Sequence, residues 1–90
     1  MKLDEAIQIA EHLCWQVYRL AKEEESFSIA QLQAMLAMVD AADQLYGEAD
    51  PDATGALKEA AQIIRMAMEE NPTPVPAAAL ASLGECFLFL

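Results

Sequence analysis

The stretch SIAQLQAMLAMVDAADQLYG, residues 28–47, decides the fold. Ser28 is followed three residues later by Gln31, the spacing of a capping box, in which each side chain accepts a hydrogen bond from the other residue's backbone N–H. Phe27, just before the cap, can pack on Leu32 as a hydrophobic staple. Gly47 is a typical residue for ending a helix. These signals predict a helix over 29–46.

This predicted helix is apolar on more than one side, which is typical of a helix buried among other elements. One face carries Leu32, Met35, Leu36, Val39 and Tyr46, and another carries Ala30, Ala34, Ala37 and Ala41. We therefore expect helix 29–46 to be the central element of the fold, with a neighbour that approaches closely along the alanines.

Two amphipathic helices are predicted on either side of it, over 4–24 and 52–70. Both segments repeat apolar residues at spacings of three and four, which places them on one helical face. Asp50 followed by Pro51 is a start signal for the second of them, and Asn71 followed by Pro72 ends it. The short connections favour antiparallel packing, so the sequence predicts an all-α, up-down-up three-helix bundle.

The C-terminal segment is predicted to add a short fourth helix over 77–88, or an apolar tail. In a continuous helix Leu80, Leu83, Phe87 and Leu90 would share one face, although Gly84 leaves that continuation open. The ending CFLFL is too apolar to remain in water, so it should cover this bundle or a second copy of it. Residues 1–90 are interpreted as a single domain.

Composition excludes several classes of protein. An apolar fraction of 56% argues against disorder, and 15 acidic against 5 basic residues, a net charge of −10, argues against direct nucleic-acid binding. No basic region precedes a long apolar run, so we expect neither a signal peptide nor a membrane span. Cys14 and Cys86 lack C-x-x-C spacing and lie among apolar residues, which favours reduced core thiols in a cytoplasmic protein.

No catalytic constellation is evident. The single histidine, His12, lies about 200° around its helix from Cys14, so the two cannot form a nucleophile–base pair within that helix. Glycine-rich phosphate loops and metal-binding histidine spacing are absent from the sequence. We expect no enzyme, no cofactor and no small-molecule substrate.

One motif suggests a metal site. Residues 50–57 resemble the first eight positions of an EF-hand calcium loop, with Asp50, Asp52 and Thr54 at ligand positions. Position 12 of such a loop would be Ala61, where the loop requires a bidentate Glu. We therefore interpret Asp50 as a helix cap and predict no metal.

Glutamates are predicted to gather at one pole of the bundle, against the favourable direction of the helix dipoles. They are Glu23, Glu24 and Glu25, which end the first helix, and Glu69 and Glu70, which end the third. Two interpretations stay open: this acidic pole is functional, or the acids keep a very apolar protein soluble.

Trp15 is predicted to point away from the core into a polar strip that includes His12 and Arg19. An exposed Trp is typical of binding hot spots, so these three residues are candidate interface residues, together with Phe87, Phe89 and Leu90 of the tail. Alternatively, Arg19 stacks on the indole, or the tail covers it.

Taken together, these patterns predict a non-enzymatic acidic helical module, homodimeric, that binds or inhibits a partner protein. The alternative is an acidic mimic of nucleic acid that blocks a DNA-binding or defence protein.

Overall fold

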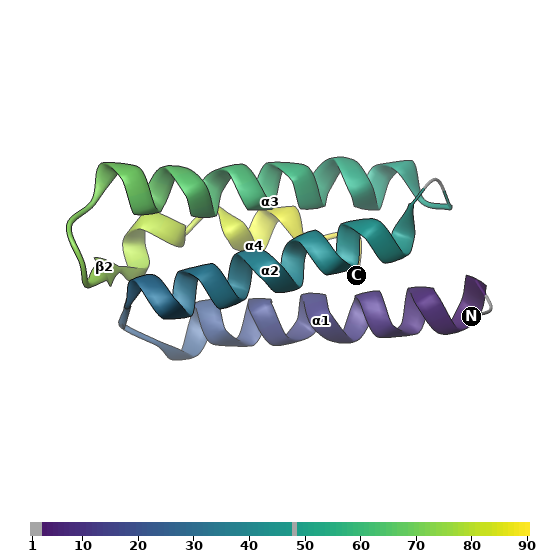
Figure 1. Ribbon diagram of the computed structural model, residues 1–90, viewed down its shortest axis with the longest axis horizontal. Coiled ribbons are helices and arrows are strands. Elements are labelled where there is room, and N and C mark those ends of the chain that lie inside the picture. Colours follow the sequence, from purple (N-terminus) through teal and green to yellow (C-terminus); the bar gives the residue numbers. More distant parts are fainter. Residues whose placement is uncertain (1–2, 48) are drawn as a thin grey trace.

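Three long antiparallel helices form the body of the protein in the computed structural model, which describes residues 3–47 and 49–90 (Figure 1). Helix α1 spans Leu3–Glu23, α2 spans Ile29–Tyr46 and α3 spans Pro51–Glu70. Helix α2 packs on both α1 and α3, so it is the central helix. The predicted all-α, up-down-up bundle is therefore confirmed, with helix ends within a residue of those predicted.

The start and stop signals of α2 work as the sequence predicts. The Ser28 hydroxyl accepts a hydrogen bond from the Gln31 amide at 3.1 Å, and the Gln31 side chain accepts one from the Ser28 amide at 2.7 Å. At the other end Gly47 adopts a φ of 53°, a conformation that costs a glycine little, and its amide bonds the Asp43 carbonyl at 3.0 Å.

Helix α3 begins at the predicted Asp-Pro signal. The Asp50 carboxylate accepts a hydrogen bond from the Ala53 amide at 3.1 Å, while Pro51 occupies the first turn, where no N–H is needed. The helix ends before Asn71, whose backbone is extended. Its buried face includes Leu57 and Ile64, both at 0% exposure.

The C-terminal segment contains a short fourth helix, as predicted, but the helix does not extend over the whole of 77–88. The segment forms a 3₁₀ helix, η1, over Ala77–Leu80 and a short helix, α4, over Leu83–Cys86, with a break between them. Neither Pro76 nor Ser82 provides a side-chain cap, so no local signal holds the two turns in register. Gly84 lies inside α4 and not at the break.

This segment packs on its own bundle, against α1 and α3, and completes the core. Leu80, Leu83 and Phe87 are buried, at 3%, 0% and 4% exposure. Leu90, predicted to share their face, is 37% exposed. We refer to residues 77–90 as the C-terminal layer.

A two-residue ribbon that the sequence did not predict closes one end of the bundle. Strand β1, Ser26–Phe27, pairs antiparallel with β2, Val75–Pro76, and the Ala77 amide bonds the Glu25 carbonyl at 2.9 Å. The ribbon buries Phe27 at 1% and Val75 at 0% exposure. It therefore ties the linker after α3 to the turn between α1 and α2.

Candidate functional site

The groups considered for catalysis make no hydrogen bond to one another in the described residues: His12 contacts Gln16, and Cys86 contacts the Ser82 carbonyl. His12 lies exposed on α1, and its Nε2 is 3.0 Å from the Gln16 side-chain nitrogen. Burial, with the charge of Glu11, raises the pKa of the Cys14 thiol to about 11, and burial likewise raises the pKa of Cys86. A thiol that stays protonated at neutral pH is a weak nucleophile. Both cysteines are buried and free, so we regard them as core residues.

The residues of the predicted calcium-like loop serve α3 in this structure. Asp50 caps the helix, and the Thr54 hydroxyl donates a hydrogen bond to the Pro51 carbonyl at 3.0 Å. Asp52 is exposed in the first turn, where an acidic side chain interacts favourably with the helix dipole. Across residues 3–47 and 49–90, no group of three His, Cys, Asp or Glu side chains is arranged to hold a metal.

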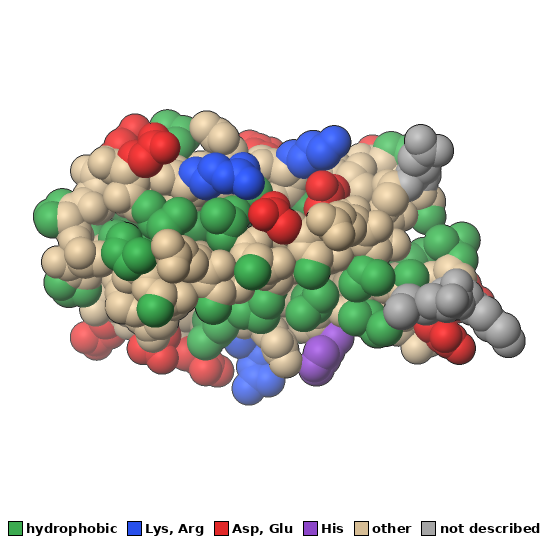
Figure 2. Space-filling model, in the orientation of Figure 1, with side chains coloured by type: hydrophobic (Ala, Val, Ile, Leu, Met, Phe, Trp, Pro, Cys, Tyr) green, Lys and Arg blue, Asp and Glu red, His purple; other side chains and the backbone are tan. Residues whose placement is uncertain are grey.

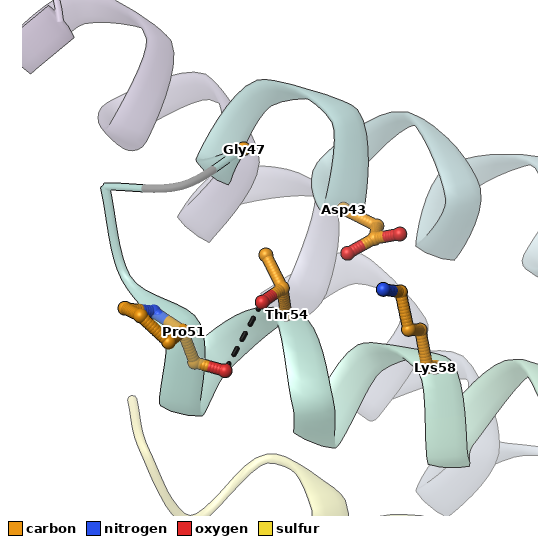
Figure 3. Close-up of a pocket in the computed structure, with 5 residues that line it drawn as sticks. All are labelled: Asp43, Gly47, Pro51, Thr54 and Lys58. Carbon is orange, nitrogen blue, oxygen red and sulfur yellow. Dashed lines mark hydrogen bonds between the residues drawn. The ribbon is translucent and has the colours of Figure 1, made fainter.

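An open cleft of about 540 Å³ lies beside the turn between α2 and α3, where Asp43, Gly47, Pro51, Thr54 and Lys58 line it. The Asp43 carboxylate and the Lys58 ammonium point toward one another across it (Figure 3). One carboxylate oxygen, Oδ1 of Asp43, is buried with no hydrogen-bond partner in the described structure. The facing opposite charges of Asp43 and Lys58 favour contact between α2 and α3.

The predicted acidic pole lies where α1 and α3 both end, beside the β1–β2 ribbon (Figure 1). All of its glutamates are exposed: Glu23, Glu24, Glu25, Glu69 and Glu70. Glu23 forms an ion pair with Arg19 at 3.8 Å, and because both side chains are largely exposed the pair contributes little stability, at most about 1 kcal/mol. Whether this pole imitates nucleic acid stays a prediction.

Trp15 is 49% exposed and belongs to a chain of aromatic contacts. Its ring meets Tyr18 edge-on at 5.7 Å between centroids, and Tyr18 in turn meets Phe87 at 6.3 Å. Arg19, considered as a stacking partner for the indole, pairs with Glu23 instead. Phe87 of the C-terminal layer contacts Tyr18, the neighbour of Trp15, and about half of the indole remains exposed to solvent.

The tail residues predicted at an interface separate into two groups. Phe87 is buried within its own bundle at 4% exposure, so it is a core residue and not a surface for a partner. Phe89 is partly buried against Tyr46, with ring centroids 5.8 Å apart, and Leu90 is 37% exposed. The most exposed apolar side chain of the tail is one we did not single out, Leu88, at 83%.

Replacing Trp15 with alanine is expected to lower the free energy of unfolding by about 1–2 kcal/mol. The indole is half exposed and makes one edge-on aromatic contact, and such contacts contribute about 0.5–1.5 kcal/mol. Urea unfolding followed by circular dichroism measures the change. A loss above about 3 kcal/mol, the cost of truncating a buried aromatic residue, would place Trp15 in the core.

An apolar surface runs along the length of the protein over α1 and α2 on the face that Figure 2 shows, and its α2 part is one of the apolar faces predicted for helix 29–46. We call it the outer band, and it comprises Ile9, Leu13, Leu20, Ala34, Ala37, Met38, Ala41 and Leu45. Leu20 of α1 and Ala34 of α2 line the same hollow, so the α1 and α2 parts of the outer band lie side by side there. Ile9 is 44% exposed, and Ala34 and Ala37 are exposed.

The outer band corrects the prediction that a neighbour approaches the alanines of α2. None of the described elements covers Ala34 or Ala37. The only charged residues of α2, Asp40 and Asp43, are on its α3 side: Asp40 pairs with Arg65 at 3.7 Å, and Asp43 faces Lys58. The α2 part of the band therefore carries no charge. An unusually low number of charges in α2 was the signal that could have identified this surface.

No protein-family model, curated protein or solved structure matches this chain. Within the part of the chain that the structure describes, no helix combines the length and the apolar character needed to cross a bilayer.

Proposed function

We propose that the protein is a non-enzymatic interaction module that forms a homodimer through the outer band and binds or inhibits a partner protein. The observation that supports this proposal is the exposed, uncharged face of the central helix, at Ala34 and Ala37, beside Leu20 of α1, which lines the same hollow as Ala34. Large contiguous patches of exposed apolar surface are uncommon on monomeric proteins and are typical of interaction sites.

The shape of the band suits a second helical pair. Ala34, Ala37 and Ala41 follow one another at spacings of three and four along α2, so they form a nearly straight strip with small side chains. Small residues allow two helices to approach closely, and Leu13 and Leu20 on α1 can pack beside that contact. A twofold dimer uses the same surface on both copies, which a self-complementary apolar strip permits.

The dimer is tested by placing charges at the centre of the band. The double substitution Ala34→Glu and Ala37→Glu is expected to raise the dimer dissociation constant at least tenfold, which corresponds to about 1.4 kcal/mol. The cost arises because each buried carboxylate must lose its hydration at the interface. Size-exclusion chromatography with light scattering, over a range of protein concentrations, measures the constant.

A matched control carries the same two charges elsewhere. Ala49→Glu with Ala78→Glu changes two exposed alanines outside the band and should leave the dissociation constant unchanged. If the wild-type protein remains monomeric at high concentration, the homodimer proposal is wrong. If the double glutamate variant still dimerises, the interface lies on a surface other than the outer band.

The free thiols support a cytoplasmic location for this module. Cys14 and Cys86 are both buried and unbridged, and structural disulfides are rare where the cytosol keeps thiols reduced.

A further inference from the structure

A narrow slot lies between the second half of α1 and the C-terminal layer, on a different part of the surface from the outer band. Its volume is about 150 Å³. The lining residues are Tyr18, Ala21, Lys22, Ala77, Leu80, Ala81, Leu83 and Gly84. Leu80 and Leu83 at its base are buried, at 3% and 0% exposure, and the Tyr18 ring forms one wall. The slot is therefore apolar except for one cation and the Tyr18 hydroxyl.

The cation is Lys22, and its position is unusual for a protein with this charge. Its ammonium lies 4.5 Å from the centroid of the Tyr18 ring, over the face of the ring. With 15 acidic residues and 5 basic ones, an ion pair would be the ordinary outcome, yet no described carboxylate lies within ion-pair distance of Lys22. The ammonium is thus held at the slot by a cation–π contact, with its charge not neutralised.

Gly84 keeps the slot open. It lies within α4 with an ordinary helical backbone, and a methyl group at this position would be 3.8 Å from the Tyr18 ring, an ordinary contact distance. A methyl group therefore fits, but a longer side chain would extend into the space between Tyr18 and α4. The position offers a way to fill the slot without straining the backbone.

We propose that this slot binds a small carboxylate that carries a single six-membered ring. An apolar cavity of about 150 Å³ is large enough for one benzene ring, which fixes the size of the apolar group. The ring enters between Tyr18 and Leu83, and its carboxylate pairs with the Lys22 ammonium at the edge of the slot. Trp15 does not line the slot but contacts the Tyr18 ring edge-on.

The net charge of −10 opposes an anion at long range, but two features limit this effect. No acidic residue lines the slot. Glu23 and Glu85 directly follow the lining residues Lys22 and Gly84 in the chain, and of these two Glu23 is paired with Arg19. Acidic residues more than about 8 Å away are largely screened at physiological ionic strength. The pairing with Lys22, at the exposed edge of the slot, is the interaction that favours a carboxylate over an uncharged compound of the same shape.

The probe for this proposal is 3-phenylpropionate, with 3-phenylpropan-1-ol as its uncharged counterpart. Trp15 is the only tryptophan, so its fluorescence reports on the slot through Tyr18. Saturable binding of the carboxylate is expected with a dissociation constant on the order of 1 mM or lower. The Gly84 amide resonance in a ¹H–¹⁵N spectrum should shift along the same titration curve.

Three variants separate the contribution of the Lys22 charge to the affinity from the contribution of the shape of the slot. Lys22→Gln should weaken binding of the carboxylate by up to about fivefold, the range of an exposed ion pair, and leave binding of the alcohol unchanged, because only the charge pairing is lost. Gly84→Leu should abolish binding of both compounds by filling the slot. Lys58→Gln removes a cation from the cleft between α2 and α3 and should change neither affinity.

Equal carboxylate affinity in wild type and Gly84→Leu would overturn the proposal, as would an absence of saturable binding by the wild type. A Lys22→Gln effect that is the same for acid and alcohol would show that Lys22 acts through the shape of the slot and would overturn the role given to its charge. The site does not depend on the homodimer, so glutamates in the outer band should leave it intact.

Discussion

Replacing Phe87 with alanine is expected to lower the free energy of unfolding by about 3–5 kcal/mol, the usual cost of truncating a buried aromatic side chain. Phe87 is 4% exposed, and its ring contacts Tyr18 of α1 and Phe89 of the tail. Its loss would leave a cavity where the C-terminal layer meets α1. Urea unfolding followed by circular dichroism, at several protein concentrations, gives the value.

The adjacent residue is the matched control. Leu88 is 83% exposed, so Leu88→Ala should change the free energy of unfolding by no more than about 0.5 kcal/mol. A larger effect at Leu88 than at Phe87 would mean that the tail packs with the opposite face inward. A Phe87→Ala effect that appears only at concentrations where the protein dimerises would mean that the tail packs on a second copy.

Alkaline pH is expected to destabilise the protein steeply between about pH 9 and 11. Burial, then the charge of Glu11, raises the pKa of Cys14 from 9.0 to about 11. Burial, then the charges of Cys14, Glu11 and Asp50, raises the pKa of Tyr46 from 10.0 to about 12. Both groups hold their protons in the folded state at pH values where the unfolded chain has released them.

Because of this difference in pKa, the free energy of unfolding falls as the pH rises. Below pH 9 both states keep the two protons, and the stabilisation is fully present. As pH rises through the unfolded values, the unfolded state is favoured by up to about 1.4 kcal/mol per pH unit for each group, until the folded-state pKa is reached. Denaturant unfolding repeated at pH 8, 9, 10 and 11 measures the slope.

Two variants show how far Cys14 and Tyr46 each cause the fall in the free energy of unfolding with pH. Cys14→Ala removes one titration and should flatten the slope between pH 9 and 11, and Glu11→Gln should lower both pKa values and reduce the total loss. A wild-type free energy of unfolding that stays constant up to pH 11 would contradict the prediction, since it would mean that neither group titrates differently on folding.

The three long helices could be predicted from the sequence because local signals set their boundaries. Ser28 with Gln31 and then Gly47 define both ends of α2 within one stretch of chain, and Asp50 with Pro51 does the same for the start of α3. Each signal works through hydrogen bonds between residues three or four positions apart. No tertiary contact is needed to locate them.

The C-terminal layer and the ribbon could not be predicted in the same way. Pro76 and Ser82 make no side-chain cap, so the break between η1 and α4 is set by how Leu80 and Leu83 fit against α1 and α3. The ribbon pairs Phe27 with Val75, residues remote in sequence, and two-residue strands give no alternating pattern to recognise.

For the candidate sites, the helical periodicity identified Trp15 as exposed, and the structure agrees. The periodicity could not identify the outer band, because α2 has two apolar faces and the sequence alone does not say which of them the rest of the chain covers. It also could not identify the slot at Lys22, since the walls come from α1 and from a segment whose helix was predicted with the wrong length.

The ribbon between β1 and β2 has a consequence for the order in which the protein folds. The helical hairpins α1–α2 and α2–α3 join across short turns, while the ribbon brings together Ser26 and Pro76 around the whole of α2 and α3. Closing so long a loop costs about 2 kcal/mol more in chain entropy than closing a turn of about five residues. The hairpins should form first, and the ribbon with the C-terminal layer should dock last as a separate cooperative unit whose amide hydrogens exchange with solvent sooner than those of α2.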